Sequence, residues 1–267
     1  MDTAKLYLAY VGMFLKSQME YKTSFFMGIF ANVYCYFITF ITFWILINKF
    51  TTIGGWNFSE ISILYGLNLL TYAISGMLFW YSIYFLEQLV TTGQLDRMLV
   101  RPVGIIPQLV CQRFGHTFIG QIIVTLMFLI PALWQQLLID FSLLKIIYII
   151  LAIISGIMIQ GGAIIMVGAL SFKILRSTDI GQIVYYDIRN FINYPLNIYP
   201  GFIKIVLTFI LPWAFINYYP SIIILNKAQN SFDLILGLLV PIVALLFFGL
   251  SLYLFKKGLN LYASAGN

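Results

Sequence analysis

The stretch IIYIILAIISGIMIQGGAIIMVGALSF, residues 146–172, decides the fold class of this chain. It contains no Asp, Glu, Lys, Arg or His. About 20 apolar residues are enough for a helix to cross the roughly 30 Å hydrocarbon core of a bilayer. A helix suits that core because it satisfies its own backbone hydrogen bonds where water is absent. The stretch therefore predicts a transmembrane helix.

Five further segments share this character, so the sequence predicts an all-α integral membrane protein with six transmembrane helices. The other five run approximately from Ser24 to Asn48, Ile61 to Leu86, Phe114 to Ile139, Ile205 to Ile224 and Leu234 to Phe255. His116 is the only Asp, Glu, Lys, Arg or His within them. The segment 205–224 is the least regular, because Pro212 and Pro220 interrupt it.

The composition of the whole chain agrees with a membrane protein. Of its 267 residues, 61% are hydrophobic and 9% are charged, and the mean hydropathy is +0.95. A soluble domain carries about 25% charged residues, which cover its water-facing surface. The 24 Phe, 18 Tyr and 2 Cys exclude disordered, coiled-coil and disulfide-rich classes.

Positive charge is distributed unequally between the two sides that the six predicted spans define. Cytoplasmic loops retain Lys and Arg, so the richer side is expected to be cytoplasmic, with both termini. That side holds twelve: Lys5, Lys16, Lys22, Arg97, Arg101, Arg113, Lys173, Arg176, Arg189, Lys204, Lys256 and Lys257. The other side holds Lys49, Lys145 and Lys227. Because the loops are short, retention by anionic lipid explains the charge of +6 better than a nucleic-acid partner does.

Residues 1–22 are expected to form an interfacial helix on the cytoplasmic surface. At about 100° per residue, Asp2, Lys5, Lys16 and Glu20 fall within one arc, and apolar side chains cover the rest. A signal peptide is not expected, because the following apolar run is too long and no A-x-A cleavage site closes it.

The predicted spans lack the groups that catalysis or ion coupling requires. Moving a proton or activating water needs an ionisable or metal-binding group at depth, and the predicted spans have none there. The chain also lacks a G-x-x-x-x-G-K-[ST] phosphate loop, so energy from ATP would have to come from a partner. We therefore expect a non-catalytic chain with no catalytic residue, metal site or cofactor of its own.

Amide side chains are the candidates for lining a pathway through the spans, namely Asn68, Gln121 and Gln160. Gln160 is the best of them, since it lies in mid-span beside Gly161 and Gly162, where an unpaired amide is costly. Hydrogen bonding between helices is the alternative explanation for all three.

The loop from Glu87 to Arg113, EQLVTTGQLDRMLVRPVGIIPQLVCQR, suits a docking site for another protein. A helix is expected to stop at Gly93, and a short amphipathic turn should follow and break at Arg101-Pro102. In that turn, Leu95, Met98 and Leu99 can pack against the spans while Asp96, Arg97 and Arg101 face the cytoplasm. A simple juxtamembrane anchor is the alternative.

Here the sequence resembles the permease subunits of type 2 ABC exporters, in the branch that carries G-x-L-D-x-x-L-x-R-P-V between its second and third spans. The matching residues are Gly93, Leu95, Asp96, Leu99, Arg101, Pro102 and Val103. Further matches are Tyr194, Pro195, Tyr199 and Pro200, then Pro212, Phe215, Tyr219 and Pro220, and finally Gly258, Tyr262, Ser264 and Ala265. The resemblance covers essentially the whole chain.

The resemblance implies a single permease domain, residues 1–267, with an N-terminal interface helix and a loop at 87–113 that docks on a separate ATPase as a coupling helix. The implied ATPase-coupling residues are Gly93, Leu95, Asp96, Arg97, Leu99, Arg101 and Pro102. It also implies a broken, re-entrant outer segment at Pro212 to Phe232. One departure is the long segment 173–204, for which we expect a cytoplasmic connection containing an amphipathic helix, with Asp179, Asp187 and Arg189 facing water.

The function implied is the membrane subunit of an ATP-driven exporter in the bacterial inner membrane, moving a drug-like, antimicrobial-peptide or lipid-linked molecule. Two ATPase subunits would bind ATP and Mg²⁺ and serve two permeases, either identical or divergent. A secondary transporter is the alternative from another class, although it would be expected to hold an intramembrane charge. A scaffold or sensor subunit of an ABC-type complex is a third possibility.

Overall fold

The computed structural model describes residues 3–50, 52–84, 86–112, 114–140, 142–174 and 176–263. Asp2, Arg113, Ser264 and Ala265, which belong to predicted segments or motifs, lie outside these ranges. Nearly all of the described chain is helical, and the β-type pairing found in it is a bridge between Ile53 and Trp56.

The helices follow one another along the chain in a simple order. The first half contains α1 (Thr3–Gln18), η1 (Met19–Tyr21), α2 (Lys22–Phe50), α3 (Phe58–Ser75), η2 (Gly76–Trp80), α4 (Tyr81–Tyr84), α5 (Leu86–Thr91), α6 (Asp96–Leu99), α7 (Ile105–Gln112) and α8 (Phe118–Ile139). The second half contains α9 (Leu143–Leu170), α10 (Ser177–Gly181), η3 (Gln182–Asp187), η4 (Ile188–Asn193), η5 (Leu196–Ile198), α11 (Gly201–Ile205), η6 (Val206–Ile210), η7 (Pro212–Phe215), α12 (Tyr218–Ile224), α13 (Ser231–Leu238) and α14 (Val240–Leu259).

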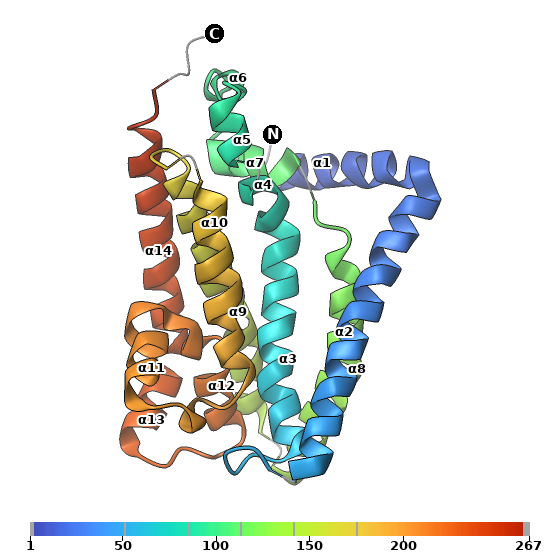
Figure 1. Ribbon diagram of the computed structural model, residues 1–267, viewed down its shortest axis with the longest axis vertical. Coiled ribbons are helices and arrows are strands. Elements are labelled where there is room, and N and C mark those ends of the chain that lie inside the picture. Colours follow the sequence, from blue (N-terminus) through green and yellow to red (C-terminus); the bar gives the residue numbers. More distant parts are fainter. Residues whose placement is uncertain are drawn as a thin grey trace.

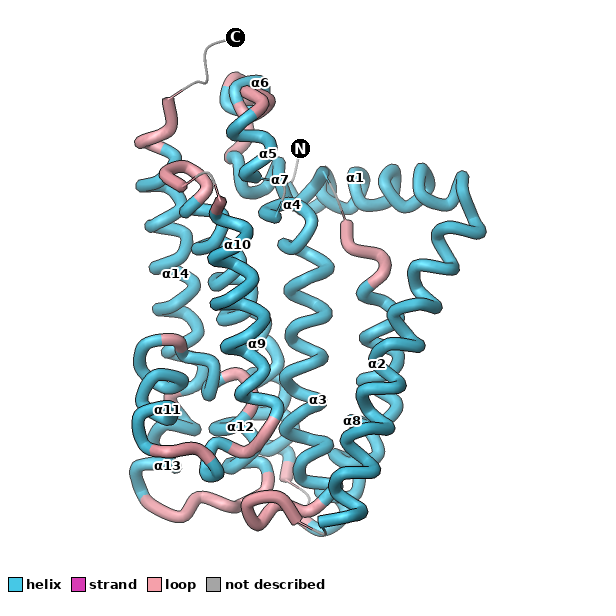
Figure 2. Tube along the Cα trace, viewed as in Figure 1, coloured by secondary structure: helices cyan, strands magenta, loops and turns pink. Residues whose placement is uncertain are grey.

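The long helices run between two ends of the molecule (Figure 1). One end carries α1, which lies crosswise to α2, together with α6 and the C-terminal end of α14. We call this end the terminal face and the other the opposite face, where loops join α2 to α3 and α8 to α9 (Figure 2). A helix is present in the segment predicted to be interfacial, as α1 followed by the short η1.

Five described helices are long and apolar enough to cross a membrane: Tyr10–Thr42, Phe58–Trp80, Phe118–Ile139, Leu143–Leu170 and Val240–Leu259. They correspond to the first four predicted spans and the sixth. The sixth begins later than expected, because α13 ends at Leu238 and forms a separate short helix before α14.

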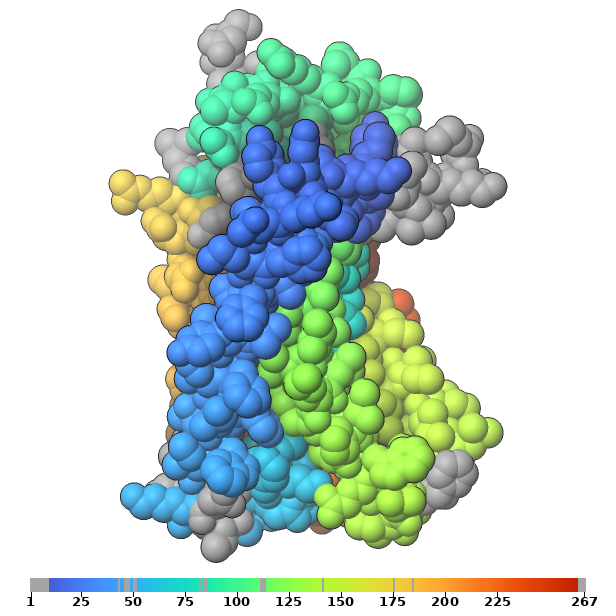
Figure 3. Space-filling view, turned by 90° about the vertical axis from the view of Figure 1, so that its right-hand side faces the viewer, coloured from blue at the N-terminus to red at the C-terminus, as the bar shows by residue number. Residues whose placement is uncertain are grey.

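The α3 helix lies at the centre of the bundle and is almost wholly buried, whereas α2 is largely exposed. The main partner of α2 is α8, beside which it lies in Figure 3. Phe40 stacks on Phe128 with ring centroids 4.6 Å apart, and Phe25 stacks on His116 at the same separation. A Cβ atom on Gly120 would fall 2.4 Å from the backbone oxygen of Ile29, so this glycine permits the close approach of α2 and α8.

The predicted fifth span, Ile205 to Ile224, is wrong as one continuous helix. Residues Gly201–Ile210 and Pro212–Ile224 form two arms bent by 72° at Leu211, and both arms lie in the half of the molecule near the opposite face (Figure 1). Leu211 is extended, with φ −115° and ψ 106°, because the residue before a proline avoids the helical region. The implied broken segment is thus present, although it starts at Gly201 rather than at Pro212.

The predicted cytoplasmic connection at 173–204 is also wrong. Residues 177–193, comprising α10, η3 and η4, run antiparallel to α3 from the terminal face toward the opposite face (Figure 1). Hydrogen bonds mark the path: Ser177 Oγ donates to Glu87 Oε2 (3.1 Å), Asn68 Nδ2 donates to Asn193 Oδ1 (2.8 Å), and Asn197 Nδ2 donates to the Gly54 oxygen (2.6 Å). We call residues 177–193 the crossing segment.

The crossing segment lies between α9 and α14 in the order of the chain and runs between the two faces, although it is not among the helices that are long and apolar enough to cross a membrane. Arg189 and Lys204 therefore leave the set of basic residues expected on the cytoplasmic side, and ten of the twelve remain. The charge asymmetry keeps its sign, so the expected orientation is unchanged.

Candidate functional site

The turn around α6 projects beyond the rest of the terminal face (Figure 1). The preceding helix α5 ends at Thr91, and Gly93 has a φ of +69°, a left-handed conformation that glycine adopts without strain. The predicted helix stop at Gly93 is confirmed.

Two apolar residues and one amide hold this turn in place. Leu95 and Met98 are buried, as predicted. The Gln108 side chain donates from Nε2 to the backbone oxygens of Met98 (3.0 Å) and Val103 (2.6 Å). The turn is therefore held by the burial of its own Leu95 and Met98 and by Gln108 of the following helix α7, as a docking element requires.

The outer surface of the turn is apolar at its centre and basic at its edges. Val100 is 85% exposed and Leu99 is 44% exposed, so the prediction that Leu99 packs inward is wrong. Arg97 and Arg101 are exposed beside them, as predicted. We define the coupling tip as Arg97, Leu99, Val100, Arg101, Pro102 and Val103. Exposed aliphatic groups flanked by arginines are typical of protein-binding surfaces.

Asp96 lies inside the turn rather than on the coupling tip. Its side chain is half-buried, and it lies close to Tyr262, which follows α14. Burial and the nearby Asp96 carboxylate raise the pKa of the Tyr262 phenol above its ordinary value. Asp96 is therefore placed to link the turn to the C-terminal end of α14.

A second polar cluster lies deep in the bundle, around Arg189 of the crossing segment. Arg189 is only 6% exposed, so the prediction that it faces water is wrong. Its guanidinium carbon lies 3.9 Å from the centroid of the Tyr72 ring and 5.9 Å from that of Tyr185. Its Nη1 atom donates to Asn68 Oδ1 at 3.4 Å.

The aromatic rings and the amide take the place of a counter-ion for Arg189. The ion pairs found in the described residues are Lys145 with Asp140 and Lys227 with Glu60, and neither involves Arg189. A cation over the face of a tyrosine ring is stabilised by the ring quadrupole, most strongly where water is excluded. The six predicted spans contain no Asp, Glu, Lys or Arg, and Arg189 lies on a segment that the sequence predicts to be outside them.

A family model described as ABC-2 family transporter protein matches residues 33–266. This chain belongs to the ABC-2 transporter family. The match begins within α2 and includes the coupling tip and the crossing segment. No curated protein and no solved structure matches the chain. Permeases of this family are generally the non-catalytic membrane subunits of ABC transporters and work with an ABC ATPase.

Two of the three predicted pathway residues lie together in this permease. Gln160 Nε2 donates to Thr71 Oγ1 (2.8 Å) and to the Asn68 backbone oxygen (3.1 Å), and the Tyr185 hydroxyl donates to Gln160 Oε1 (3.3 Å). Gln121 is separate, since its Nε2 donates to the Leu69 oxygen (3.1 Å) between α8 and α3. Asn68, Gln121 and Gln160 are all 0% exposed. Their role in a pathway stays a prediction, and these bonds favour helix bridging.

Gln160→Leu separates the two roles. We expect the variant to lose about 0.6 to 2 kcal/mol of stability, because the Thr71 and Tyr185 hydroxyls lose a buried partner. Transport per folded molecule should be unchanged. Thermal unfolding in detergent, together with transport normalised to folded protein, measures both quantities. Gln121→Leu is the matched control and should lose less, since Gln121 makes one hydrogen bond to the Leu69 oxygen. A change in substrate preference in the Gln160 variant would indicate that Gln160 lines the transport pathway.

Proposed function

We propose that this chain is the membrane-spanning permease of an ATP-driven exporter, powered by a separate ATPase that binds ATP and Mg²⁺. The observation that carries the proposal is the coupling tip, an exposed turn with Val100 at its centre and Arg97 and Arg101 at its edges, to which Gln108 donates hydrogen bonds. Membership of the ABC-2 family supports an ATPase as its partner.

The working transporter, in this proposal, contains two ATPase subunits and two permeases, either identical or divergent. The terminal face lies in the cytoplasm of a bacterial cell, with the opposite face outside the inner membrane. The excess of Lys and Arg at the terminal face supports this orientation.

The export path, we propose, runs along the exposed face of the crossing segment. Asp179, Gln182, Asp187 and Asn190 are all exposed on it. The step from Gln182 to Asp187 runs through π-helix, and the step from Asp187 to Asn190 runs into 3₁₀-helix. Each step is therefore close to one helical turn and keeps these side chains on one face. We call these four residues the polar stripe.

Exposure of the polar stripe to the lipid hydrocarbon core would be energetically unfavourable. A carboxylate facing the hydrocarbon core is strongly unfavourable, so Asp187 is expected to face water or another protein. A water-filled path between this chain and the second permease would place both water and protein beside Asp187. The exposed Ile183 and Phe191 on the same segment give this path apolar character as well.

The charges of the crossing segment favour a cationic substrate. Arg189 is buried in its aromatic surroundings, while neither Asp179 nor Asp187 forms an ion pair with any described residue. The path would therefore carry negative charge beside apolar groups, which suits a cationic amphiphile such as a drug-like molecule or an antimicrobial peptide.

A secondary transporter is a second candidate, because Arg189 and Asp187 now supply ionisable groups at depth. Inside-out vesicles that contain the permease and its ATPase distinguish the two candidates. For an ATP-driven exporter, we expect a cationic dye to accumulate when ATP is added and the proton gradient is dissipated. Accumulation driven by a proton gradient without ATP would contradict the proposal and favour the secondary transporter.

A further inference from the structure

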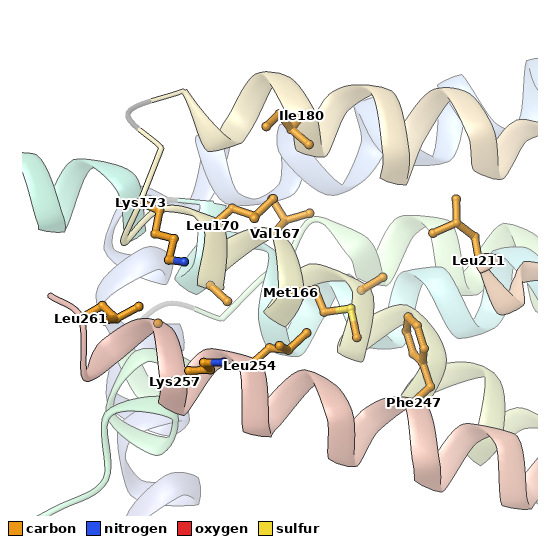
Figure 4. Close-up of a pocket in the computed structure, with 13 residues that line it drawn as sticks. Met166, Val167, Leu170, Lys173, Ile180, Leu211, Phe247, Leu254, Lys257 and Leu261 are labelled. Atoms are coloured by element: carbon orange, nitrogen blue, oxygen red, sulfur yellow. The ribbon is translucent and has the colours of Figure 1, made fainter.

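A groove of about 410 Å³ lies between α9, α10 and α14, and Leu211 lies toward one end of it (Figure 4). Its lining consists of Ala163, Met166, Val167, Ala169, Leu170, Lys173, Ile180, Leu211, Phe247, Leu254, Lys257, Gly258 and Leu261. Its size falls within the usual range for small-molecule sites. The groove is distinct from the coupling tip and from the polar stripe.

The polarity of the groove changes along its length. Lys173 and Lys257 lie toward one end in Figure 4, while Met166, Phe247 and Leu211 lie toward the other. Lys173 follows the C-terminal end of α9, and Lys257 lies near the C-terminal end of α14, so the basic end is at the terminal face. All the other lining residues are apolar.

Both ammonium groups lack a counter-ion within the described part of the chain. Neither the Lys173 nor the Lys257 side chain forms an ion pair or hydrogen bond with a described residue. Two cations at the mouth of an apolar groove leave a positive charge that an anionic group can neutralise. A cationic substrate would be repelled from this mouth.

We infer that the groove binds an anionic phospholipid. One acyl chain lies along Met166, Phe247 and Leu254, and the phosphate lies between Lys173 and Lys257. The ends of the membrane-crossing helices stand at head-group depth, which brings a lipid phosphate level with these two lysines. The lysine stems can extend toward the head group while their carbons cover the apolar wall.

Native mass spectrometry of the purified permease tests this site. The probes are phosphatidylglycerol and phosphatidylcholine with identical acyl chains. We expect the permease to prefer phosphatidylglycerol by roughly thirtyfold, because each lysine near an anionic head group strengthens binding. Lys173→Gln combined with Lys257→Gln should abolish the preference. The matched control is Lys16→Gln combined with Lys256→Gln, which removes the same charge from lysines outside the groove and should keep it.

Four outcomes would overturn the inference. The first is equal binding of the two lipids by the unaltered permease, and the second is an undiminished preference in the Lys173 and Lys257 variant. The third is displacement of the lipid by millimolar inorganic phosphate, which would mean that the lysines bind a free anion. The same spectra report the oligomeric state. The fourth outcome is loss of a dimer in the variant, without loss of lipid, which would assign the groove to a second copy of the chain.

Discussion

Val100→Asp combined with Arg101→Glu is expected to abolish ATP-driven export while leaving the permease folded. Val100 is 85% exposed, so the change should cost little in the isolated chain. In the proposed complex, the new carboxylates replace an apolar contact and a cation at the centre of the docking surface. Central interface residues typically contribute about 2 kcal/mol or more, and we therefore expect at least roughly thirtyfold weaker ATPase binding.

Co-purification of the ATPase and ATP hydrolysis by the complex measure this effect. Asn260→Asp combined with Lys256→Glu is the control, because it makes the same change in net charge at the end of α14, outside the coupling tip. Normal ATPase binding and transport by the Val100 and Arg101 variant would show that the turn is only a membrane anchor.

Asp187→Asn is expected to reduce export of a cationic amphiphile by roughly tenfold, with a neutral analogue of similar size unaffected. The substitution removes the charge and keeps the shape of an exposed side chain, so folding should be preserved. A unit charge in a partly desolvated path contributes on the order of 1 to 2 kcal/mol to the interaction with a cation nearby.

Transport of a cationic and a neutral dye in the same vesicle preparation provides the comparison. Asp233→Asn in α13 is the control, since it removes one carboxylate outside the crossing segment. An equal loss of transport for both dyes would indicate a structural role for Asp187. Unchanged transport of both dyes would show that the polar stripe does not line the export path.

The sequence predicts the five long apolar helices because each contains an apolar run long enough to cross a bilayer, where a helix satisfies its own backbone hydrogen bonds. A search for long apolar runs does not identify the crossing segment. One of its faces carries Asp187 and other polar groups, and the other carries Arg189 among tyrosines, so its average hydropathy is low. One feature of the sequence could have indicated that Arg189 is buried. Two tyrosines, Tyr185 and Tyr186, lie within five residues that end at Arg189, and aromatic rings can stabilise a buried cation.

The sequence likewise predicts only part of the candidate site. The motif located the coupling turn, and helix-breaking chemistry located its start at Gly93. Which side of the turn faces outward depends on contacts with residues outside the turn. Gln108 donates a hydrogen bond to the Met98 backbone oxygen, and the Met98 side chain is buried whereas that of Leu99 is exposed, although the two residues are apolar neighbours. Periodicity over four residues of helix cannot distinguish such neighbours.

The pairing of α2 with α8 has a consequence for how the protein is made. The ribosome delivers α2 to the membrane well before α8, and α2 touches little else in the finished bundle. Until the chain has been synthesised beyond Phe128, the aromatic rings of Phe25 and Phe40 lack their stacking partners. During that interval α2 is a lone helix in lipid, open to insertion chaperones and to quality-control proteases. A fault in α8 would therefore appear first as degradation of the amino-terminal part of the nascent permease.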